Sequence, residues 1–384
     1  MIIFYLMFAV KLKQFDWPLF ISMVLMIGLG LILQYSLSLN APQHEFSTFK
    51  RQLLFVFLLG FPMFFFISFS NYRAIRSFSY LFYFFTLLFL LAVLFLGETR
   101  RGVRGWFSLG PFTFQPVELA KIAVIIFLAR FWQGAKKPLK FKHLSLSFLF
   151  ILPAVSLIIF QPDLGSSIII IIIGLGLAFM VNRRKKYILI LIAILLVALI
   201  FSWFFLLKNY QKERILNFLN PQSDPFGRGY QRNQAIIAIG SGQLLGRGLS
   251  EGTQSQLHFL PEAKTDFIFA VLAEEFGFLG CLSFLGLYFF FLYRLLKISE
   301  QVYDNFALVL VLGVSLYFFS QMFINIGMNL GFLPVIGLSL PFLSYGGSSL
   351  IVSMLAVALV ESVVVHQPPH QVGSLDRSRS VFSI

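Results

Sequence analysis

Cysteine is almost absent from this chain of 384 residues: Cys281, inside an apolar run, is the only one. A single cysteine excludes an intrachain disulfide and a metal site built from several thiolates. Charged residues are also scarce, at 12% of the chain, whereas soluble domains are nearer a quarter charged. Because 58% of the residues are hydrophobic, little polar surface is left to face water. These scarcities predict an integral membrane protein.

Long apolar runs divide the chain into segments that match the roughly 20 residues needed to cross a bilayer. We count ten and predict an all-α polytopic membrane domain over residues 1–366, followed by a polar tail over 367–384. A long polar loop over residues 208–266 separates the seventh span from the eighth. The predicted spans centre near Leu29, Leu58, Leu87, Ile125, Val155, Ile172, Leu195, Leu282, Leu316 and Leu355.

Basic residues predict the orientation of these spans. The short connections on one side carry most of the lysines and arginines, including four in a row at 183–186, and such loops are typically cytoplasmic. Both termini are therefore predicted to be cytoplasmic, with the loop 208–266 outside. The net charge of +14 is explained by topology and lipid headgroups, so no nucleic-acid partner is predicted.

Cations also occur on the predicted outer side, against the topology trend. Arg100, Arg101 and Arg104 follow the third span, and Lys264 lies near the end of the long loop. An anionic ligand at the outer face would explain them. Binding to phospholipid headgroups of the outer leaflet is the alternative, and the sequence leaves both open.

Ionisable side chains within apolar runs are costly to bury, so a functional role is the default hypothesis. Glu118 and Lys121 are three residues apart on one face of the fourth span, where they either serve a site or only hold helices together. Asp163 begins the sixth span, where a helix cap is the alternative. Glu275 lies two turns into the eighth span. Glu361, near the end of the tenth, is expected at the membrane interface.

Two segments rich in glycine and proline, 107–116 and 331–347, look non-helical at membrane depth. Such backbone is tolerated where it packs inside the protein or lines a wet cavity. With the loop 208–266, these segments are expected to frame a cavity that opens outward. The loop ends at Asp266, at the mouth of the eighth span. From the pattern alone, Asp266 either caps that helix or is a functional acid.

The stretch GTQSQLHFLPEAKTDFIFAVLAEEFG, which begins at Gly252, resembles the signature of the SEDS family of shape, elongation, division and sporulation proteins. Within that family, this GTQSQ and the NIGM at Asn325 are RodA-like features. Val117 departs from the family pattern, which usually has serine there. Three further motifs agree in order and spacing: RGWF with QPVELAK between Arg104 and Lys121, QPDLG from Gln161, and PFLSYGGS from Pro341.

The resemblance implies a peptidoglycan glycosyltransferase in the bacterial cytoplasmic membrane. It would polymerise lipid II, the undecaprenyl-pyrophosphate-linked disaccharide–pentapeptide, at the outer face during cell-wall elongation. The implied partner is a class B penicillin-binding protein, with elongasome proteins of the MreC and MreD type as neighbours. The resemblance also marks Asp266 as the catalytic acid.

This chemistry asks for one general base, because a pyrophosphate leaving group needs no proton from a strong acid. We assign Asp266 as the base of an inverting transfer. Trp106 is expected to line the cavity against sugar or lipid. Four cations are candidates for stabilising the pyrophosphate: Arg101, Arg104, Lys121 and Lys264. Three acids are expected to organise the cavity: Glu118, Asp163 and Glu275.

No cluster of histidines and acids marks a dedicated metal site, so Mg²⁺ or Mn²⁺ would be carried by the substrate pyrophosphate. The main alternative function is a transporter that flips lipid II, because spans with buried charges and broken helices also suit transport. A scaffold for other wall enzymes is a third hypothesis. The enzyme is favoured because the acids lie toward the outer mouth and the chain contains no internal repeat.

Overall fold

The computed structural model describes residues 11–367 apart from 40–45, 101, 111, 135–138, 182–185, 188, 194–211 and 213–228. Eight helical spans in this part are long and apolar enough to cross a membrane. One span is continuous from α3 (Ser47–Leu54) through the π-helix η2 (Phe55–Gly60) to α4 (Phe61–Phe69). The others are α2 (Trp17–Leu39), α5 (Tyr72–Leu96), α7 (Phe141–Phe160), α8 (Leu164–Val181), α13 (Ile268–Gln301), α14 (Asn305–Asn329) and α15 (Gly347–Val365).

Helix α6 (Pro116–Gln133) is a further span-length helix, packed against α5, α8 and α14. All 18 of its residues form one short helix that carries three charged side chains, Glu118, Lys121 and Arg130, which makes it more polar than the apolar stretches of the other eight. Eight spans and α6 together make nine of the ten predicted spans. The seventh prediction, near Leu195, lies outside the described residues, as do most of 208–228 and the tail from 368.

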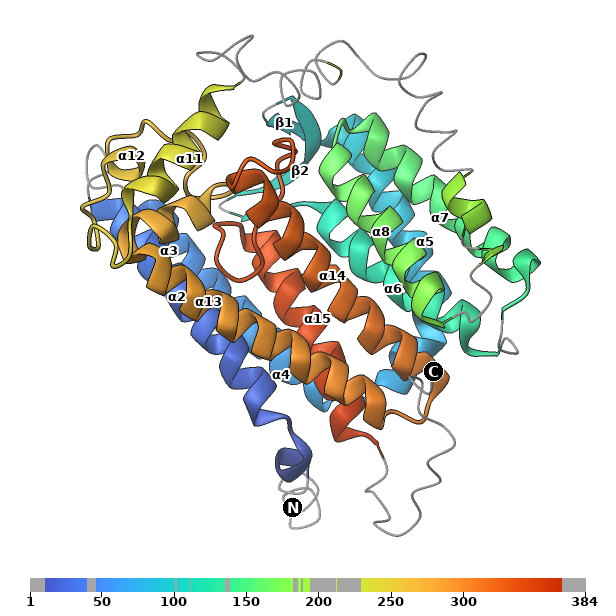
Figure 1. The fold of residues 1–384 in the computed structure, drawn as a ribbon. Helices are drawn as coiled ribbons and strands as arrows, with labels where there is room; N and C mark the ends of the chain where they lie inside the picture. The colour runs from blue at the N-terminus through green and yellow to red at the C-terminus, as the bar shows by residue number, and fades with distance from the viewer. Residues whose placement is uncertain are drawn as a thin grey trace.

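Helices α14 and α15 lie in the middle of the bundle, with α2, α4 and α13 on one side and α5 to α8 on the other (Figure 1). Burial agrees with this central place. In the most apolar 18-residue stretch of each helix, 83% of the residues of α14 and 72% of those of α15 are buried, against 28% for α5. Helix α14 packs against α6, α8 and α13, and α15 packs against α4. Mostly apolar side chains on these faces form one core.

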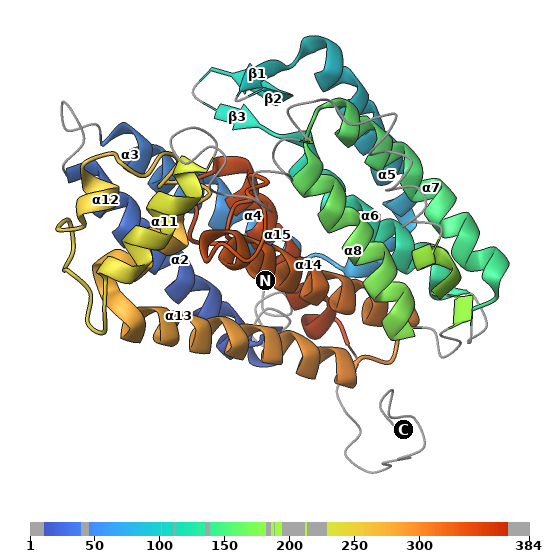
Figure 2. The same ribbon diagram turned by 45° about the horizontal axis from the view of Figure 1, so that its top comes forward.

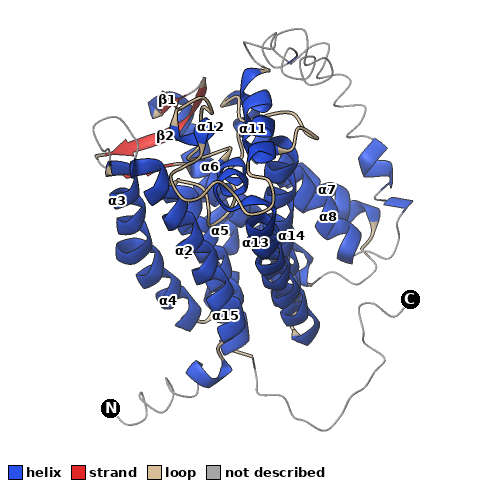
Figure 3. Ribbon diagram, turned by 60° about the vertical axis from the view of Figure 1, so that its left-hand side comes forward, coloured by secondary structure: helices blue, strands red, loops and turns tan. Residues whose placement is uncertain are grey.

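One end of the bundle carries every strand that the structure describes (Figures 1 and 3). Strands β1 (Glu98–Arg100), β2 (Val103–Leu109) and β3 (Phe112–Phe114) form an antiparallel sheet in the order β1-β2-β3. An all-α prediction did not include this sheet, which occupies part of the segment 107–116. Gly102 and Gly110 lie at its turns with φ of 80° and 65°, a conformation that glycine adopts readily.

The same end carries two short helices from the long polar loop, α11 (Tyr230–Ser241) and α12 (Thr253–Gln256). Figure 2 shows them beside the start of α13, while the strands lie beside α5. Residues 331–346 contain no regular helix or strand, as expected, and α15 begins at Gly347. This segment runs between the end of α14 and the start of α15, so it also reaches this end.

Residues near the two ends of the described chain lie together at the opposite end of the bundle. Lys11 Nζ lies 3.0 Å from His366 Nε2, which confirms that the two ends of the described chain lie on the same side of the bundle. Which side faces the cytoplasm stays a prediction. Glu361 is fully buried within the protein, where its Oε2 accepts the amide of Asp16 at 3.1 Å. Its expected depth at the membrane interface stays a prediction.

Candidate functional site

A cavity of about 1010 Å³ lies at the end of the bundle that carries the strands and α11. Its wall comes from α3, the strands, the starts of α6, α8, α11 and α15, and the segments 261–266 and 334–339. The two segments expected to be non-helical both contribute to it, as do Trp106, Glu118, Asp163 and Asp266. The structure therefore brings four of the predicted site residues around one space.

Asp266 is half-buried on this wall, in the turn that precedes α13. Its amide donates to the carbonyl of Glu262 at 3.1 Å, and α13 starts only after Phe267. The cap position of α13 is Phe267, whose side chain makes no capping hydrogen bond, so Asp266 lies one residue before the cap position. A Cβ added to Gly337 would lie 3.6 Å from Asp266 Oδ2, which places the carboxylate beside the wall segment 334–339.

Two asparagines of α14 hold the backbone of Asp266. Asn325 Nδ2 and Asn329 Nδ2 each donate to the Asp266 carbonyl at 3.0 Å. Asn325 Nδ2 also donates to the carbonyl of Leu338 at 2.6 Å, and Asn329 Oδ1 accepts the amide of Ala270 at 3.2 Å. Both asparagine side chains are fully buried, so one helix fixes Asp266, α13 and the segment 334–339 relative to one another.

The two preceding carbonyls are held in the same way. The carbonyl of Lys264 accepts Gln34 Nε2 at 3.0 Å and the amide of Tyr345 at 2.8 Å. The carbonyl of Thr265 accepts Ser344 Oγ at 2.6 Å. Three consecutive carbonyls are thus bound from α2, α14 and the segment before α15. Hydrogen bonds to buried carbonyls are costly to lose, so the backbone that carries Asp266 is fixed in one position.

Three arginines lie on the cavity wall: Arg51 from α3, Arg100 from β1 and Arg232 from α11. None of them is among the substrate-binding residues that the sequence predicted. Arg100 Nη2 donates to Glu98 Oε2 at 2.9 Å, and Arg232 Nη2 donates to the carbonyl of Gly331 at 2.9 Å. The hydrogen bond from Arg100 lowers the pKa of the exposed Glu98 carboxyl. Three elements far apart in sequence therefore place positive charge on the cavity wall.

The N-termini of α6, α8 and α15 also meet at this wall, and helix N-termini carry partial positive charge. Asp163 lies at the start of α8, where its Oδ1 accepts the amide of Ser166 at 2.9 Å and its Oδ2 accepts Ser166 Oγ at 2.8 Å. The cap predicted as an alternative for Asp163 is therefore confirmed, although the residue also lines the cavity.

Ser348, at the start of α15, joins the sheet to the central helices. Its Oγ accepts the amide of Gln115 at 3.1 Å and donates to the carbonyl of Thr113 at 2.7 Å. Gln115 immediately precedes α6, so this hydroxyl fixes the starts of α6 and α15 side by side. The motif PFLSYGGS thus contributes backbone and hydroxyl groups to the cavity wall.

Glu118 and Lys121 form the ion pair expected from their spacing, with Lys121 Nζ 2.8 Å from Glu118 Oε1. Their side chains are 7% and 0% exposed. Only Glu118 reaches the cavity wall. Lys121 lies behind it, with its Nζ 6.0 Å from the ring centre of the buried Tyr317. Lys121, predicted to stabilise the pyrophosphate, therefore does not line the cavity itself and is paired with a carboxylate that does.

The structure does not bring every predicted cation to the wall. Arg104 is exposed and donates to the carbonyls of Gly97 at 3.0 Å and Phe95 at 2.7 Å. Lys264 Nζ lies 3.4 Å from Thr48 Oγ1. Neither residue lines the cavity. Arg101 lies outside the described residues, so its role stays a prediction.

Glu275 is buried in α13 and does not line the cavity. Its Oε1 accepts the hydroxyl of Ser36 and accepts Gln256 Nε2 at 3.0 Å. It therefore organises the long loop and α2 rather than the cavity itself. Nowhere in the described chain do three or more His, Cys, Asp or Glu side chains gather in a way that could hold a metal ion.

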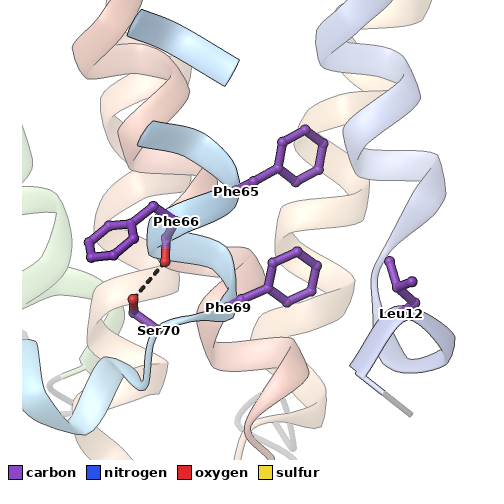
Figure 4. Close-up of a pocket in the computed structure, with 5 residues that line it drawn as sticks. All are labelled: Leu12, Phe65, Phe66, Phe69 and Ser70. Atoms are coloured by element: carbon purple, nitrogen blue, oxygen red, sulfur yellow. Dashed lines mark hydrogen bonds between the residues drawn. The ribbon is translucent and has the colours of Figure 1, made fainter. Parts of the chain in front are cut away.

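A second pocket, of about 580 Å³, lies at the opposite end of the bundle (Figure 4). Figure 4 shows Phe65 and Phe69 on α4 facing Leu12, while the hydroxyl of Ser70 donates to the carbonyl of Phe66. No ionisable side chain lines it. Sugar–phosphate chemistry needs acids and cations, so this apolar groove is not the catalytic site.

The fold and the cavity define a multi-pass membrane protein with an acid fixed beside cations at one end of its bundle. The family model for FtsW, RodA and SpoVE, described as cell cycle protein, matches residues 16–368. Peptidoglycan glycosyltransferase MrdB of Escherichia coli K12 is 44% identical over 287 residues, which are 74% of this chain and 77% of MrdB. The probable peptidoglycan glycosyltransferase FtsW of Haemophilus influenzae is 34% identical over 355 residues, covering 90% and 89% of the two chains.

Solved structures agree with this relationship. The rod shape determining protein RodA of Thermus thermophilus is 29% identical, with a TM-score of 0.69 over 92% of this chain and 98% of RodA. A chain of a peptidoglycan synthase complex that coordinates polymerization and crosslinking is 31% identical, with a TM-score of 0.78 over 92% of this chain and 99% of that one. The protein belongs to the SEDS family and is a RodA-like, multi-pass membrane glycosyltransferase.

Proposed function

We propose that this protein polymerises lipid II into glycan strands at the outer face of the cytoplasmic membrane during cell-wall elongation. The observation that carries the proposal is the placement of Asp266, whose backbone is bound on three successive carbonyls and whose side chain lies on the wall of a large cavity. The relatives named as peptidoglycan glycosyltransferases support the same substrate class.

Asp266 acts as the general base. Its carboxylate takes the proton from the acceptor sugar hydroxyl while that oxygen attacks the anomeric carbon of the donor sugar. The bond between this carbon and the pyrophosphate breaks, and the pyrophosphate leaves with the bonding electron pair. A single displacement inverts the anomeric configuration, and Asp266 then returns its proton to solvent. One carboxylate suffices because the leaving group is already an anion.

The leaving pyrophosphate needs positive charge in fixed positions. Arg51, Arg100 and Arg232 supply full charges on the wall, and the starts of α6, α8 and α15 supply partial ones. Mg²⁺ or Mn²⁺ carried by the pyrophosphate would add Lewis-acid stabilisation, with the wall carboxylates of Asp163 and Glu118 as neighbouring oxygen donors. Trp106, also on the wall, offers a flat apolar face to a sugar ring.

The expected partner is a class B penicillin-binding protein that cross-links the new strand. The similarity to a chain from a peptidoglycan synthase complex supports this assignment. Proteins of the MreC and MreD type are the expected neighbours in the elongation machinery.

The test is polymerisation by purified protein, together with its penicillin-binding partner, supplied with lipid II in detergent. Wild type is expected to make long glycan, and Asp266→Ala and Asp266→Asn are expected to make none at equal protein concentration. Glycan made at the wild-type rate by both variants would sink the assignment of Asp266 as the base.

Flipping of lipid II is the alternative function, and the Glu118–Lys121 pair within the bundle is the observation that favours it. The two functions separate in vesicles. A flippase moves labelled lipid II between leaflets in the Asp266→Asn variant as fast as in wild type, and makes no glycan in either. An enzyme makes glycan, and its loss in Asp266→Asn is independent of leaflet exchange.

A further inference from the structure

Helix α13 is broken eleven residues after Asp266, at Gly277, where φ is 67° and ψ is −164°. In an unbroken helix, the carbonyls of Glu274 and Glu275 would accept the amides of Phe278 and Leu279, four residues later. At the break these two carbonyls and two amides need other partners, because buried backbone groups are rarely left unbonded.

The loop segment 243–248 supplies all four partners. The amides of Arg247 and Gly248 donate to the two carbonyls at 2.9 Å and 3.1 Å. The carbonyls of Gln243 and Leu244 accept the two amides at 2.8 Å and 3.1 Å. The long loop is therefore built into the break in α13 rather than lying over it.

Two glycines make this insertion possible. A Cβ on Gly246 would lie 2.1 Å from the carbonyl oxygen of Glu275, and a Cβ on Gly277 would lie 2.2 Å from the amide nitrogen of Gly246. Both residues also have positive φ, of 85° and 67°. Any side chain at either position would force the two backbones apart.

The side chain of Glu274 links the break back to the chain that carries Asp266. Its Oε1 accepts the amide of Gln254 at 2.8 Å and its Oε2 accepts the amide of Ser255 at 3.0 Å. The carbonyl of Gln254 in turn accepts the amide of Leu260 at 3.0 Å. Glu274 is fully buried. These hydrogen bonds connect α13 through α12 to the turn before Asp266.

The side chain of Glu275 binds different partners. Its Oε1 accepts the hydroxyl of Ser36 on α2, Gln256 Nε2 at 3.0 Å and the amide of Ser250 at 3.4 Å. Glu275 thus binds both ends of the segment 250–256 and also α2, whereas Glu274 binds two backbone amides within that segment.

We propose that Glu274 and Glu275 are positioning residues for Asp266. They bind the segment 250–256 to the break in α13 and so fix the start of the turn 260–266. The asparagines of α14 fix the end of this turn at Asp266. This role rests on the proposed function of Asp266 as the general base. Neither acid touches the substrate cavity, so neither is expected to contribute to substrate binding.

The experiment uses the full-length protein with its penicillin-binding partner and compares Glu274→Gln with Glu251→Gln. Glu251 lies in the same loop and is exposed, so it is a matched control for the change from acid to amide. The glutamine introduced by Glu274→Gln keeps the side-chain volume but turns an NH₂ group toward a backbone amide. We expect kcat for lipid II polymerisation to fall roughly tenfold to a hundredfold, as misplacement of a reacting group does, while KM stays within about twofold.

Hydrogen exchange of the amides in 253–262 supplies a readout independent of activity, and Glu274→Gln is expected to accelerate it whereas Glu251→Gln is not. Ser36→Ala tests the Glu275 branch with a change that leaves both acids in place, and is expected to give a smaller loss of kcat. Faster exchange with unchanged kcat overturns the positioning role and leaves Asp266 as the base. Wild-type rates from Asp266→Asn overturn the proposed function and this role with it.

Discussion

At one end of the bundle Asp16 bonds to both Arg294 and Glu361, whereas at the other end Asp266 lies on the wall of a cavity of about 1010 Å³. Arg294 Nη2 pairs with Asp16 Oδ2, and the side chains are 20% and 7% exposed. Asp16 also caps α2 by accepting the amide of Leu19 at 3.0 Å. These bonds join α2, α13 and α15 at the end opposite the cavity.

The two ends also differ in the bonds that hold each acid in place. The carboxylate oxygens of Asp16 accept bonds from the amide of Leu19 and from Arg294, so this side chain has a structural role. At Asp266 the bonds from α14 bind the backbone carbonyl, which fixes the residue while placing its side chain at the cavity. The side chain of Asp16 thus binds a helix N-terminus and a cation, whereas the backbone of Asp266 is bound by a neighbouring helix.

The largest expected effect in this comparison is on stability, from Arg294→Met. The substitution leaves Asp16 buried without its cation, which typically costs about 3–5 kcal/mol. We expect a large drop in the thermal unfolding temperature in detergent, with unchanged polymerisation per folded molecule. Arg76→Met is the control: its pair with Asp304 is 3.4 Å long and about a quarter exposed, so its loss should cost less than about 1 kcal/mol. Equal destabilisation by both variants would contradict the structural role of Asp16.

A smaller effect, on rate, is expected from Asn325→Ala. The change removes the donor to the Leu338 carbonyl and one of the two donors to the Asp266 carbonyl, and an unpaired buried carbonyl costs about 1–3 kcal/mol. We expect kcat to fall about tenfold with little change in KM, because one tenfold step corresponds to about 1.4 kcal/mol of transition-state stabilisation. A loss confined to KM would show that Asn325 serves substrate binding instead of the placement of Asp266.

A more modest effect, on the KM for lipid II, is expected from replacing a cation. The structure and the sequence differ on which arginine binds the substrate. Arg51 lies on the cavity wall, whereas Arg104 donates to two backbone carbonyls away from it. Arg51→Gln is expected to raise the KM for lipid II roughly tenfold, the size of one lost bond to a charged group, and Arg104→Gln is expected to raise it less. Steady-state polymerisation at fixed salt measures both. The reverse order would favour the cation assignment made from sequence.

The smallest effect is expected from Glu98→Gln. The carboxylate pairs with Arg100 at 2.9 Å, but the side chains are 50% and 44% exposed, and solvent screens such pairs. We expect no measurable change in the thermal unfolding temperature. A clear destabilisation would mean that the β1–β2 turn contributes more to the fold than its exposure implies.

The features that the sequence predicted well all depend on local signals. Apolar length located nine spans, and a spacing of three residues located the Glu118–Lys121 pair. The position of Asp266 at the end of a long loop, together with a family motif, identified the acid now found on the cavity wall. Each of these signals is contained in a few neighbouring residues.

The features that sequence reasoning missed depend on contacts between distant residues. The bond from Asn325 to Asp266 spans 59 positions, and that from Gln34 to Lys264 spans 230. Arg51 precedes an apolar run, which is typical of a membrane-interface residue, and only the packing of α3 brings it to the cavity. The small sheet was missed because two of its strands have three residues each, too few for an alternating pattern.

The most direct test of the central claim compares Asp266→Asn with Asp16→Asn, the same substitution at the two ends of the bundle. The account predicts that Asp266→Asn unfolds at the wild-type temperature but polymerises lipid II roughly 10²–10⁴ times more slowly, the usual contribution of a general base. Asp16→Asn is predicted to unfold at a lower temperature and to keep its rate per folded molecule. A folded Asp266→Asn protein that makes glycan at the wild-type rate would contradict the account.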